Sequence, residues 1–281
     1  MSINSTQDFI DHVQQELDAN RLILPTLPEV ALVIRAAVAK DDATTQQLAN
    51  LIITDVALSA RLMQVANSPA YRGTEPVNSI QMAITRLGNR SISWLVTSLM
   101  MQQLFKPSTK YLEHNFRALW ESSVNVSGLS RALTTLFAPH LNAEQAMLAG
   151  LIFQIGKLPI LTLVENLPEF KDYPPRLNKL LEKTHPAIGK MIMDTWAFPS
   201  DLKAVTFEYV NFRRDSGAKA DYVDIVQVAF LQTIIGTDHP ANDIDRSSVP
   251  AFRKLGLSSD VDILKIAGVA EEIAMTSALF S

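Results

Sequence analysis

The chain has 281 residues, of which 47% are hydrophobic and 19% are charged, and its formal net charge is −4. This balance is typical of a globular protein and excludes a disordered chain, and the length allows one large domain or two modest ones. With no cysteine and no dense run of Lys or Arg, the sequence excludes a disulfide framework and a thiolate metal site and gives no reason to expect nucleic-acid binding. The polar N-terminus lacks a signal-peptide pattern, and we expect no apolar stretch of the ~20 residues that cross a bilayer, so a cytoplasmic protein without membrane contact is predicted.

Helical periodicity and helix start signals run through the whole chain. Thr44 and Gln47 have the spacing of a capping box, and Asp55 is the predicted N-cap of the next helix. A longer helix with an apolar stripe is expected after Gly88, and Pro107 ends it. Other helices are predicted near 6–19, 28–39, 111–137, 142–155, 157–166, 176–183, 186–195, 199–211, 220–236 and 259–279.

Strand signals are weak, because sustained alternation and hairpin dipeptides are both missing from the sequence. We therefore predict an all-α fold. The best boundary lies around residues 105–112, which gives a first helical bundle at 1–108 and a second at 109–281. The linker is short, so the two bundles are expected to pack against each other.

The most informative segment is Met147–Leu158, which reads as an apolar helix that ends at Gly156 before Lys157 begins the next helix. It resembles the L-L-H-D-I-G-K signature of HD-type phosphohydrolases, in which the adjacent His and Asp bind divalent metal. Phe153 and Gln154 stand at those two positions here. A phenyl ring offers no lone pair, and an amide oxygen lacks the negative charge that offsets desolvation of a dication.

The N-terminal half carries further pieces of one family pattern. Leu24–Val30 resembles an L-P-x-L-P opening, and Ile53–Met63 resembles an x-D-P-x-L-x-x-x-L-L stretch in which Val56 replaces the usual Pro. Val65–Ser68 and Ser79–Gly88 resemble A-N-S and S-I-x-x-A-I-x-x-L-G elements. This series resembles the HDOD family, regarded as non-catalytic relatives of the HD and HD-GYP phosphohydrolases. The resemblance implies an N-terminal helical bundle packed against an HD-domain-like bundle, and a place in bacterial signal transduction.

The same resemblance marks the positions of a degenerate metal site. His185 matches the His of an H-x-x-x-G element and, with Lys157, remains as a possible residual ligand-binding residue. The positions where the resemblance implies ligands but other residues stand are Ser123, Phe153, Gln154, Glu208, Tyr209 and Phe230. No catalytic residue, metal or cofactor is therefore expected.

Simpler structural interpretations apply to several of these residues. His185 precedes Pro186 and fits a capping or packing role at a helix start, and Lys157 fits a solvated boundary position. Phe153 and Phe230 fit the core. Three tryptophans are expected to be buried anchors, and an exposed one would indicate an interface: Trp94, Trp120 and Trp196.

Three functions follow from these patterns. The first is a signalling module without enzyme activity that acts by binding another protein. The second is a nucleotide or cyclic-dinucleotide sensor that uses the ancestral cleft, with Lys157 and His185 meeting a phosphate. The third is a metal-dependent phosphohydrolase with a rearranged site, to which His185, Glu208, Asp194 or Asp224 contribute.

Overall fold

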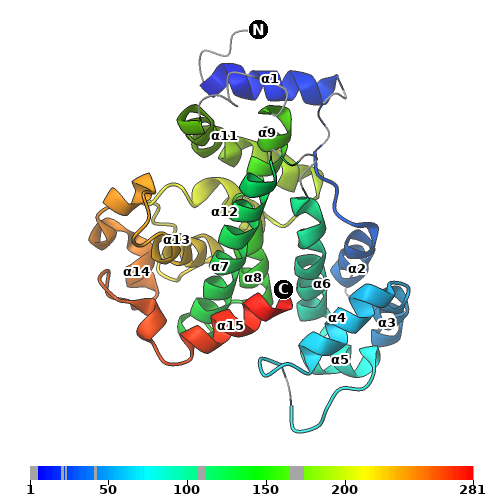
Figure 1. Ribbon diagram of the computed structural model, residues 1–281. Coiled ribbons are helices and arrows are strands. Elements are labelled where there is room, and N and C mark those ends of the chain that lie inside the picture. The colour runs from blue at the N-terminus through cyan, green and yellow to red at the C-terminus, as the bar shows by residue number, and fades with distance from the viewer. Residues whose placement is uncertain are drawn as a thin grey trace.

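The computed structural model describes residues 6–19, 22, 24–40, 43–71, 73–106, 110, 112–164 and 174–280, and these residues form no strand. The all-α prediction is confirmed (Figure 1). The helices are α1 (Thr6–Asp18), α2 (Glu29–Ala39), α3 (Thr45–Ile53), α4 (Val56–Ala66), α5 (Ile80–Leu87), α6 (Asn89–Met101), α7 (Glu113–Phe137), α8 (Ala143–Ile152), α9 (Lys157–Val164), α11 (Pro174–Thr195), α12 (Ser200–Glu208), α13 (Tyr222–Thr233), α14 (Pro250–Lys254) and α15 (Val269–Leu279).

The predicted start signals act as expected. The Thr44 hydroxyl accepts the backbone N–H of Gln47, whose side chain reaches back to the Thr44 backbone, so both halves of the capping box are present. Asp55 caps α4 by accepting the backbone N–H of Leu58 at 2.9 Å. These bonds satisfy backbone donors that a helix start otherwise leaves free.

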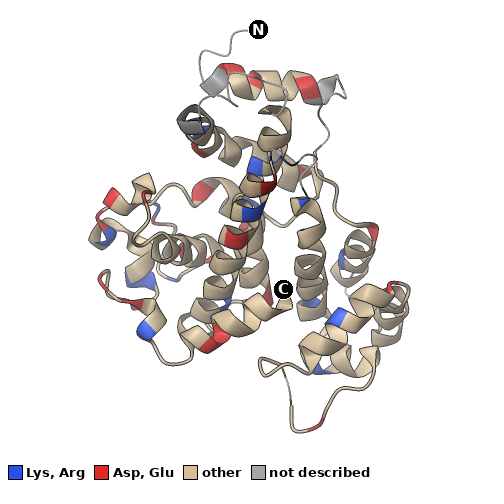
Figure 2. Cartoon of the chain, in the orientation of Figure 1, with Lys and Arg blue, Asp and Glu red and all other residues tan. Residues whose placement is uncertain are grey.

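Helices α2–α6 form one group, and α6 connects it to the rest of the chain by packing against α8 (Figure 1). The other group is built on the antiparallel pair α7 and α8, with α13 and α15 also against α7. A Cβ at Gly150 would lie 2.5 Å from the Cα of Ser127, so α7 and α8 meet backbone to backbone at this point. Lys, Arg, Asp and Glu are interspersed over both groups of helices (Figure 2).

One expectation about the membrane is corrected. Ala143–Val164 is long and apolar enough to cross a bilayer, although we expected no such segment. Its hydrophobic character has a structural reason, since 83% of the apolar stretch is buried inside the protein. The chain also turns at residues 153–156, between α8 and α9.

The prediction that helices at 176–183 and 186–195 are separate is wrong, because α11 runs from Pro174 to Thr195 with Pro186 inside it. A proline in a helix removes one backbone donor and crowds the carbonyl one turn earlier. The side chain of His185 contributes here by hydrogen bonding through Nδ1 to the carbonyl of Leu181 at 2.7 Å. The side chain of His185 thus adds a hydrogen bond to the turn that precedes Pro186, although it does not replace the one that proline removes.

Both ends of the chain make contacts that link the N-terminal and C-terminal parts of the fold. Helix α1 packs against α11, and α15 lies along α7 (Figure 1). Arg61 of α4 donates a hydrogen bond to the carbonyl of Leu279 at the end of α15. The predicted boundary at 108 stays a prediction, and residues 107–109 and 111 lie outside the described residues.

Candidate functional site

The HD-like segment forms a tight turn against α11. Phe153 and Gln154 follow the last residue of α8, and both are buried. A Cβ at Gly156 would lie 2.1 Å from the carbonyl oxygen of His185 and 2.5 Å from the backbone nitrogen of Gly189. Only glycine permits this approach, which brings the α8–α9 turn onto the H-x-x-x-G element.

Three side chains of this region form a buried chain of hydrogen bonds. The phenol oxygen of Tyr209 lies 2.7 Å from Nε2 of His185 and accepts the amide N–H of Gln154 at 3.1 Å. Because Nδ1 of His185 faces the carbonyl of Leu181, Nδ1 carries the proton and Nε2 accepts the Tyr209 O–H. Both ring nitrogens of His185 are therefore engaged.

Burial keeps this network neutral. Desolvation, reinforced by the positive charge of Lys157, lowers the pKa of His185 to about 3. Desolvation also raises the pKa of Tyr209 well above its ordinary value. At neutral pH the phenol is therefore protonated and the imidazole is uncharged, as the direction of the hydrogen bonds requires.

Aromatic rings fill the space around the network. The ring centroids of Phe153 and Tyr209 are 5.0 Å apart, and Phe230 lies 5.6 Å from each of them. Phe212 stacks on the ring of Phe230. The structure thus brings together five of the predicted site residues: Phe153, Gln154, His185, Tyr209 and Phe230.

A cleft of about 220 Å³ lies next to this cluster, lined by Gln154, Lys157, Phe230 and His239 among others. It shares Lys157 and His239 with a neighbouring hollow of about 640 Å³. Lys157 is not solvated as predicted, since its Nζ lies 2.6 Å from Glu182 and 12% of its side chain is exposed. His185 is fully buried and is not among the residues that line either hollow.

The sequence motifs do not mark Glu182 or His239 as residues of this site. The carboxylate of Glu182 pairs with Lys157, and its other oxygen lies 3.8 Å from Nε2 of His239. Burial alone would raise the pKa of Glu182, but His239 and Lys157 hold it well below its usual value. His239 also accepts the backbone N–H of Ala241 and contacts the edge of Phe230. No local motif marks this contact, because the loop after α13 returns to α11.

A family model, the HDOD domain, matches residues 24–211 of the sequence. The chain belongs to the HDOD family. The match spans the N-terminal pieces, the degenerate HD segment and the H-x-x-x-G element, as the resemblance predicted. No curated protein matches the chain.

Solved structures share the HDOD architecture over nearly the whole chain. A Shewanella amazonensis protein provisionally named a metal-dependent phosphohydrolase has 27% identity and a TM-score of 0.83, and the match covers 98% of this chain and 99% of that one. An HDOD domain protein of unknown function from Geobacter sulfurreducens has 20% identity and a TM-score of 0.69, with 98% and 99% covered. HDOD membership supports a regulatory module for this chain.

Two predicted positions of the HDOD site have no hydrogen bond to the cluster among the described residues. Glu208 pairs with Arg214, which also binds Asp221 in two hydrogen bonds. Ser123 is buried, and its hydroxyl has no hydrogen-bond partner in the described part of the chain. The neighbouring Ser122 lines the cleft beside Gln154.

The residues proposed for a rearranged metal site are also dispersed. Asp194 is exposed and pairs with Lys203, whereas Asp224 is buried and pairs with Lys254. Within the described ranges, no three or more His, Cys, Asp or Glu side chains are grouped so that they could hold a metal ion. The donor set at the HD position therefore does not fit a dication, which needs several lone-pair donors with negative charge.

Proposed function

We propose that this HDOD chain is a non-catalytic regulatory module that acts by binding another protein. The observation that carries the proposal is the use of the His185 Nε2 lone pair, which accepts a hydrogen bond from Tyr209 at 2.7 Å. A metal ion could use that lone pair only if the hydrogen bond broke. The remaining neighbours would then offer the ion a phenyl ring, a phenol and a neutral amide.

The metal content of the protein tests the non-catalytic part. Protein purified without chelator and then supplied with Fe²⁺, Mn²⁺ or Zn²⁺ is expected to carry well below one metal per chain, measured by inductively coupled plasma mass spectrometry after desalting. Hydrolysis of bis-p-nitrophenyl phosphate is expected to be no faster than with His185→Ala protein. Stoichiometric metal together with turnover that His185→Ala abolishes would instead establish a phosphohydrolase, which the name of the Shewanella protein suggests for that protein.

Exposed apolar side chains at the corner between α3 and α4 support a protein partner. Ile53 is 53% exposed and Val56 is 80% exposed, and only Thr54 and Asp55 separate them in sequence. Neighbouring apolar groups in water favour association with another apolar surface.

A pull-down from source cells, repeated at low salt, tests this part. Val56→Asp is expected to reduce partner capture severalfold, because it places a charge within the proposed contact. The control, Leu264→Asp, introduces the same charge near the C-terminus, at a side chain that is 58% exposed. This variant is expected to leave partner capture unchanged. Absence of any captured partner, or equal losses in both variants, would contradict the proposal.

The alternative of a nucleotide sensor retains one supporting observation, the cleft beside Lys157 and His239. Lys157 and His185 were expected to meet a phosphate together, but only Lys157 reaches the cleft, and it is already paired with Glu182. Nucleotides and cyclic dinucleotides that bind there would raise the melting temperature of the protein and lose this effect in Lys157→Gln protein. No shift with any of them would discard the sensor.

A further inference from the structure

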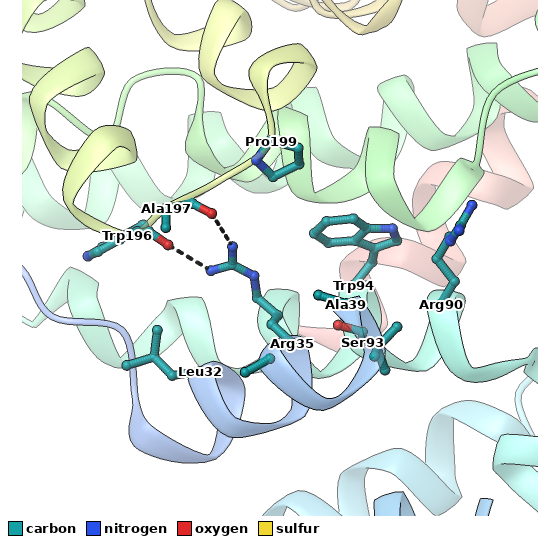
Figure 3. Close-up of a pocket in the computed structure, with 11 residues that line it drawn as sticks. Leu32, Arg35, Ala39, Arg90, Ser93, Trp94, Trp196, Ala197 and Pro199 are labelled. Carbon is teal, nitrogen blue, oxygen red and sulfur yellow. Dashed lines mark hydrogen bonds between the residues drawn. The ribbon is translucent and has the colours of Figure 1, made fainter. Parts of the chain in front are cut away.

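A third cavity, of about 520 Å³, lies between α2, α6 and the connection from α11 to α12 (Figure 3). Its volume falls within the ~300–1,000 Å³ typical of small-molecule sites. Leu32, Ala36 and Ala39 of α2 form an apolar wall, and Pro199 lies across from them. This cavity shares no residue with the HDOD cluster, which is the group Phe153, Gln154, His185, Tyr209 and Phe230 described above. The cavity is therefore independent of the proposed function.

The cavity contains a partly buried cation, Arg35, that forms no ion pair with the residues that the structure describes. The guanidinium of Arg35 donates to the carbonyls of Trp196 and Ala197 at 3.3 and 3.1 Å and lies 3.6 Å from the ring centroid of Phe198. Carbonyls and a ring face orient the group but do not neutralise it. Desolvation lowers the pKa of Arg35 to about 10, in accord with this lack of an acidic partner. None of the described residues that line the cavity is Asp or Glu.

Three further hydrogen-bond donors near the cavity lie on α6 and, like Arg35, favour a ligand that carries negative charge or acceptor atoms. Arg90 is exposed and makes no ion pair or side-chain hydrogen bond within the described residues. Within the described residues the buried indole N–H of Trp94 has no hydrogen-bond partner, and Ser93 is a further polar residue that lines the cavity. In Figure 3, Trp94 lies between Arg35 and Arg90. The polar side chains of the cavity are thus hydrogen-bond donors, and two of them are cations.

The indole ring supplies a flat surface for the body of a ligand. Phe198 stacks on Trp94 with 6.5 Å between centroids and 21° between planes, which fixes the orientation of the indole. The remaining accessible part of Trp94 lines the cavity and adjoins the apolar wall of α2. A planar ring placed there would contact aromatic and aliphatic groups together.

We propose that this cavity binds a small organic anion with one planar ring system, whose phosphate or carboxylate meets Arg90 and Arg35 while the ring packs against Trp94. The walls come from both groups of helices, so the bound anion bridges them. Trp196 is buried as the sequence predicted, whereas Trp94 is only half-buried, and the exposed part of its ring serves this cavity.

Isothermal titration calorimetry at low ionic strength tests the site with two anions and their uncharged counterparts. Adenosine monophosphate and indole-3-acetate represent the phosphate and carboxylate classes, and adenosine and indole lack the charge. At least one anion is expected to bind and to raise the melting temperature, whereas its uncharged counterpart binds about tenfold more weakly or not at all. The anion that binds identifies the class of acid group.

Two variants locate the binding. Arg90→Gln is expected to weaken the anion about tenfold or more, and Ala36→Phe, which keeps both cations, is expected to block it by filling the cavity. Arg213→Gln removes one charge at an exposed residue outside the cavity and is expected to leave affinity unchanged. All three positions are half-buried or exposed, so melting temperatures without ligand should stay close to wild type.

The proposal is overturned if neither anion binds at millimolar concentration, or if Arg90→Gln and Ala36→Phe bind as tightly as Arg213→Gln. Loss of binding in Lys157→Gln with retention in Arg90→Gln would also overturn it, because the anion would then occupy the cleft beside the HDOD cluster. Failure of the protein-partner experiment has no bearing on these outcomes.

Discussion

Removal of the Tyr209 hydroxyl by Tyr209→Phe tests the buried network directly. The side chain is 1% exposed, and its oxygen takes part in two hydrogen bonds, with His185 at 2.7 Å and with Gln154 at 3.1 Å. The ring and its contact with Phe153 stay, so the change leaves one acceptor and one donor buried without a partner. An unsatisfied buried group costs ~1–3 kcal/mol, so we expect the free energy of unfolding to fall by about 2–4 kcal/mol.

Urea unfolding followed by circular dichroism at slightly alkaline pH measures this loss, with the slope expected to stay constant. A double-mutant cycle with Gln154→Leu separates the energy of the Tyr209–Gln154 hydrogen bond from other effects of each substitution. Once the Gln154 amide is gone, Tyr209→Phe removes one hydrogen bond fewer. We expect a coupling free energy of about 1 kcal/mol. Tyr222→Phe is the matched control, since its hydroxyl bonds Asn142 and Gln145 instead.

A loss below ~0.5 kcal/mol for Tyr209→Phe would refute the reasoning. So would a cycle with Gln154→Leu that is additive, or one that couples no more strongly than the cycle with Tyr222→Phe. A small loss would mean that the hydroxyl does not satisfy His185, whose lone pair would then be free for another ligand. An additive cycle would mean that the hydroxyl does not bond Gln154.

Three further changes probe the surroundings of the site. The folded-state pKa of His185, about 3, lies below the unfolded value near 6.5, so the unfolded state binds the proton first as pH falls. Between pH 7 and 4.5 the free energy of unfolding of wild type should therefore fall by ~2–3 kcal/mol relative to that of His185→Gln protein, measured by urea unfolding at both pH values. Parallel pH profiles of the two proteins would contradict this. Ala197 has φ of 50°, where glycine is favoured, so Ala197→Gly should stabilise the fold by about 1 kcal/mol in thermal unfolding, and a lower melting temperature would count against strain there. Gly156→Ala should destabilise the fold by ~3 kcal/mol or more, because the added Cβ clashes with the carbonyl of His185. Gly73→Ala is the control: its added Cβ would lie 3.4 Å from the nearest atom, so the change in the same assay should be under ~0.5 kcal/mol. Equal effects would show that the backbone at Gly156 shifts to relieve the clash.

The sequence predicted helix starts well where the signal is local. The capping box at Thr44 and the N-cap at Asp55 depend on side chains within three residues of the backbone donors that they satisfy. The expected helix at 259–279 is shorter in the structure, because α15 begins at Val269, directly after Gly268 with φ of 87°. The prediction of a helix break at Pro186 was wrong for a different reason. The rule for a residue before proline is local, but contacts of His185 with Leu181 and of Gly189 with the α8–α9 turn hold this part of α11 in place.

The site could be predicted as a set of residue types and not as a network. The family pattern placed Phe153, Gln154 and His185, and the structure brings all three together. The hydrogen bond between Tyr209 and His185 joins two residues that are 24 positions apart in sequence, and neither residue type alone predicts that contact. Glu182 occupied an ordinary helical position, so its pairing with Lys157 across 25 residues left no motif to read.

The neutral cluster also predicts that single changes back to metal-binding residue types at this site would destabilise the fold. An Asp side chain at position 154 would be a buried anion beside a protonated phenol, with Lys157 already held by Glu182. A His side chain at position 153 would remove the ring that packs between Tyr209 and Phe230 and add a second imidazole without a hydrogen-bond partner. Each isolated change places an unpaired polar group or charge in the core, at a cost of several kcal/mol for an unpaired charge. Only a concerted exchange that also freed His185 from Tyr209 would give a dication enough donors, so we expect the hydrogen-bonded network to oppose metal binding.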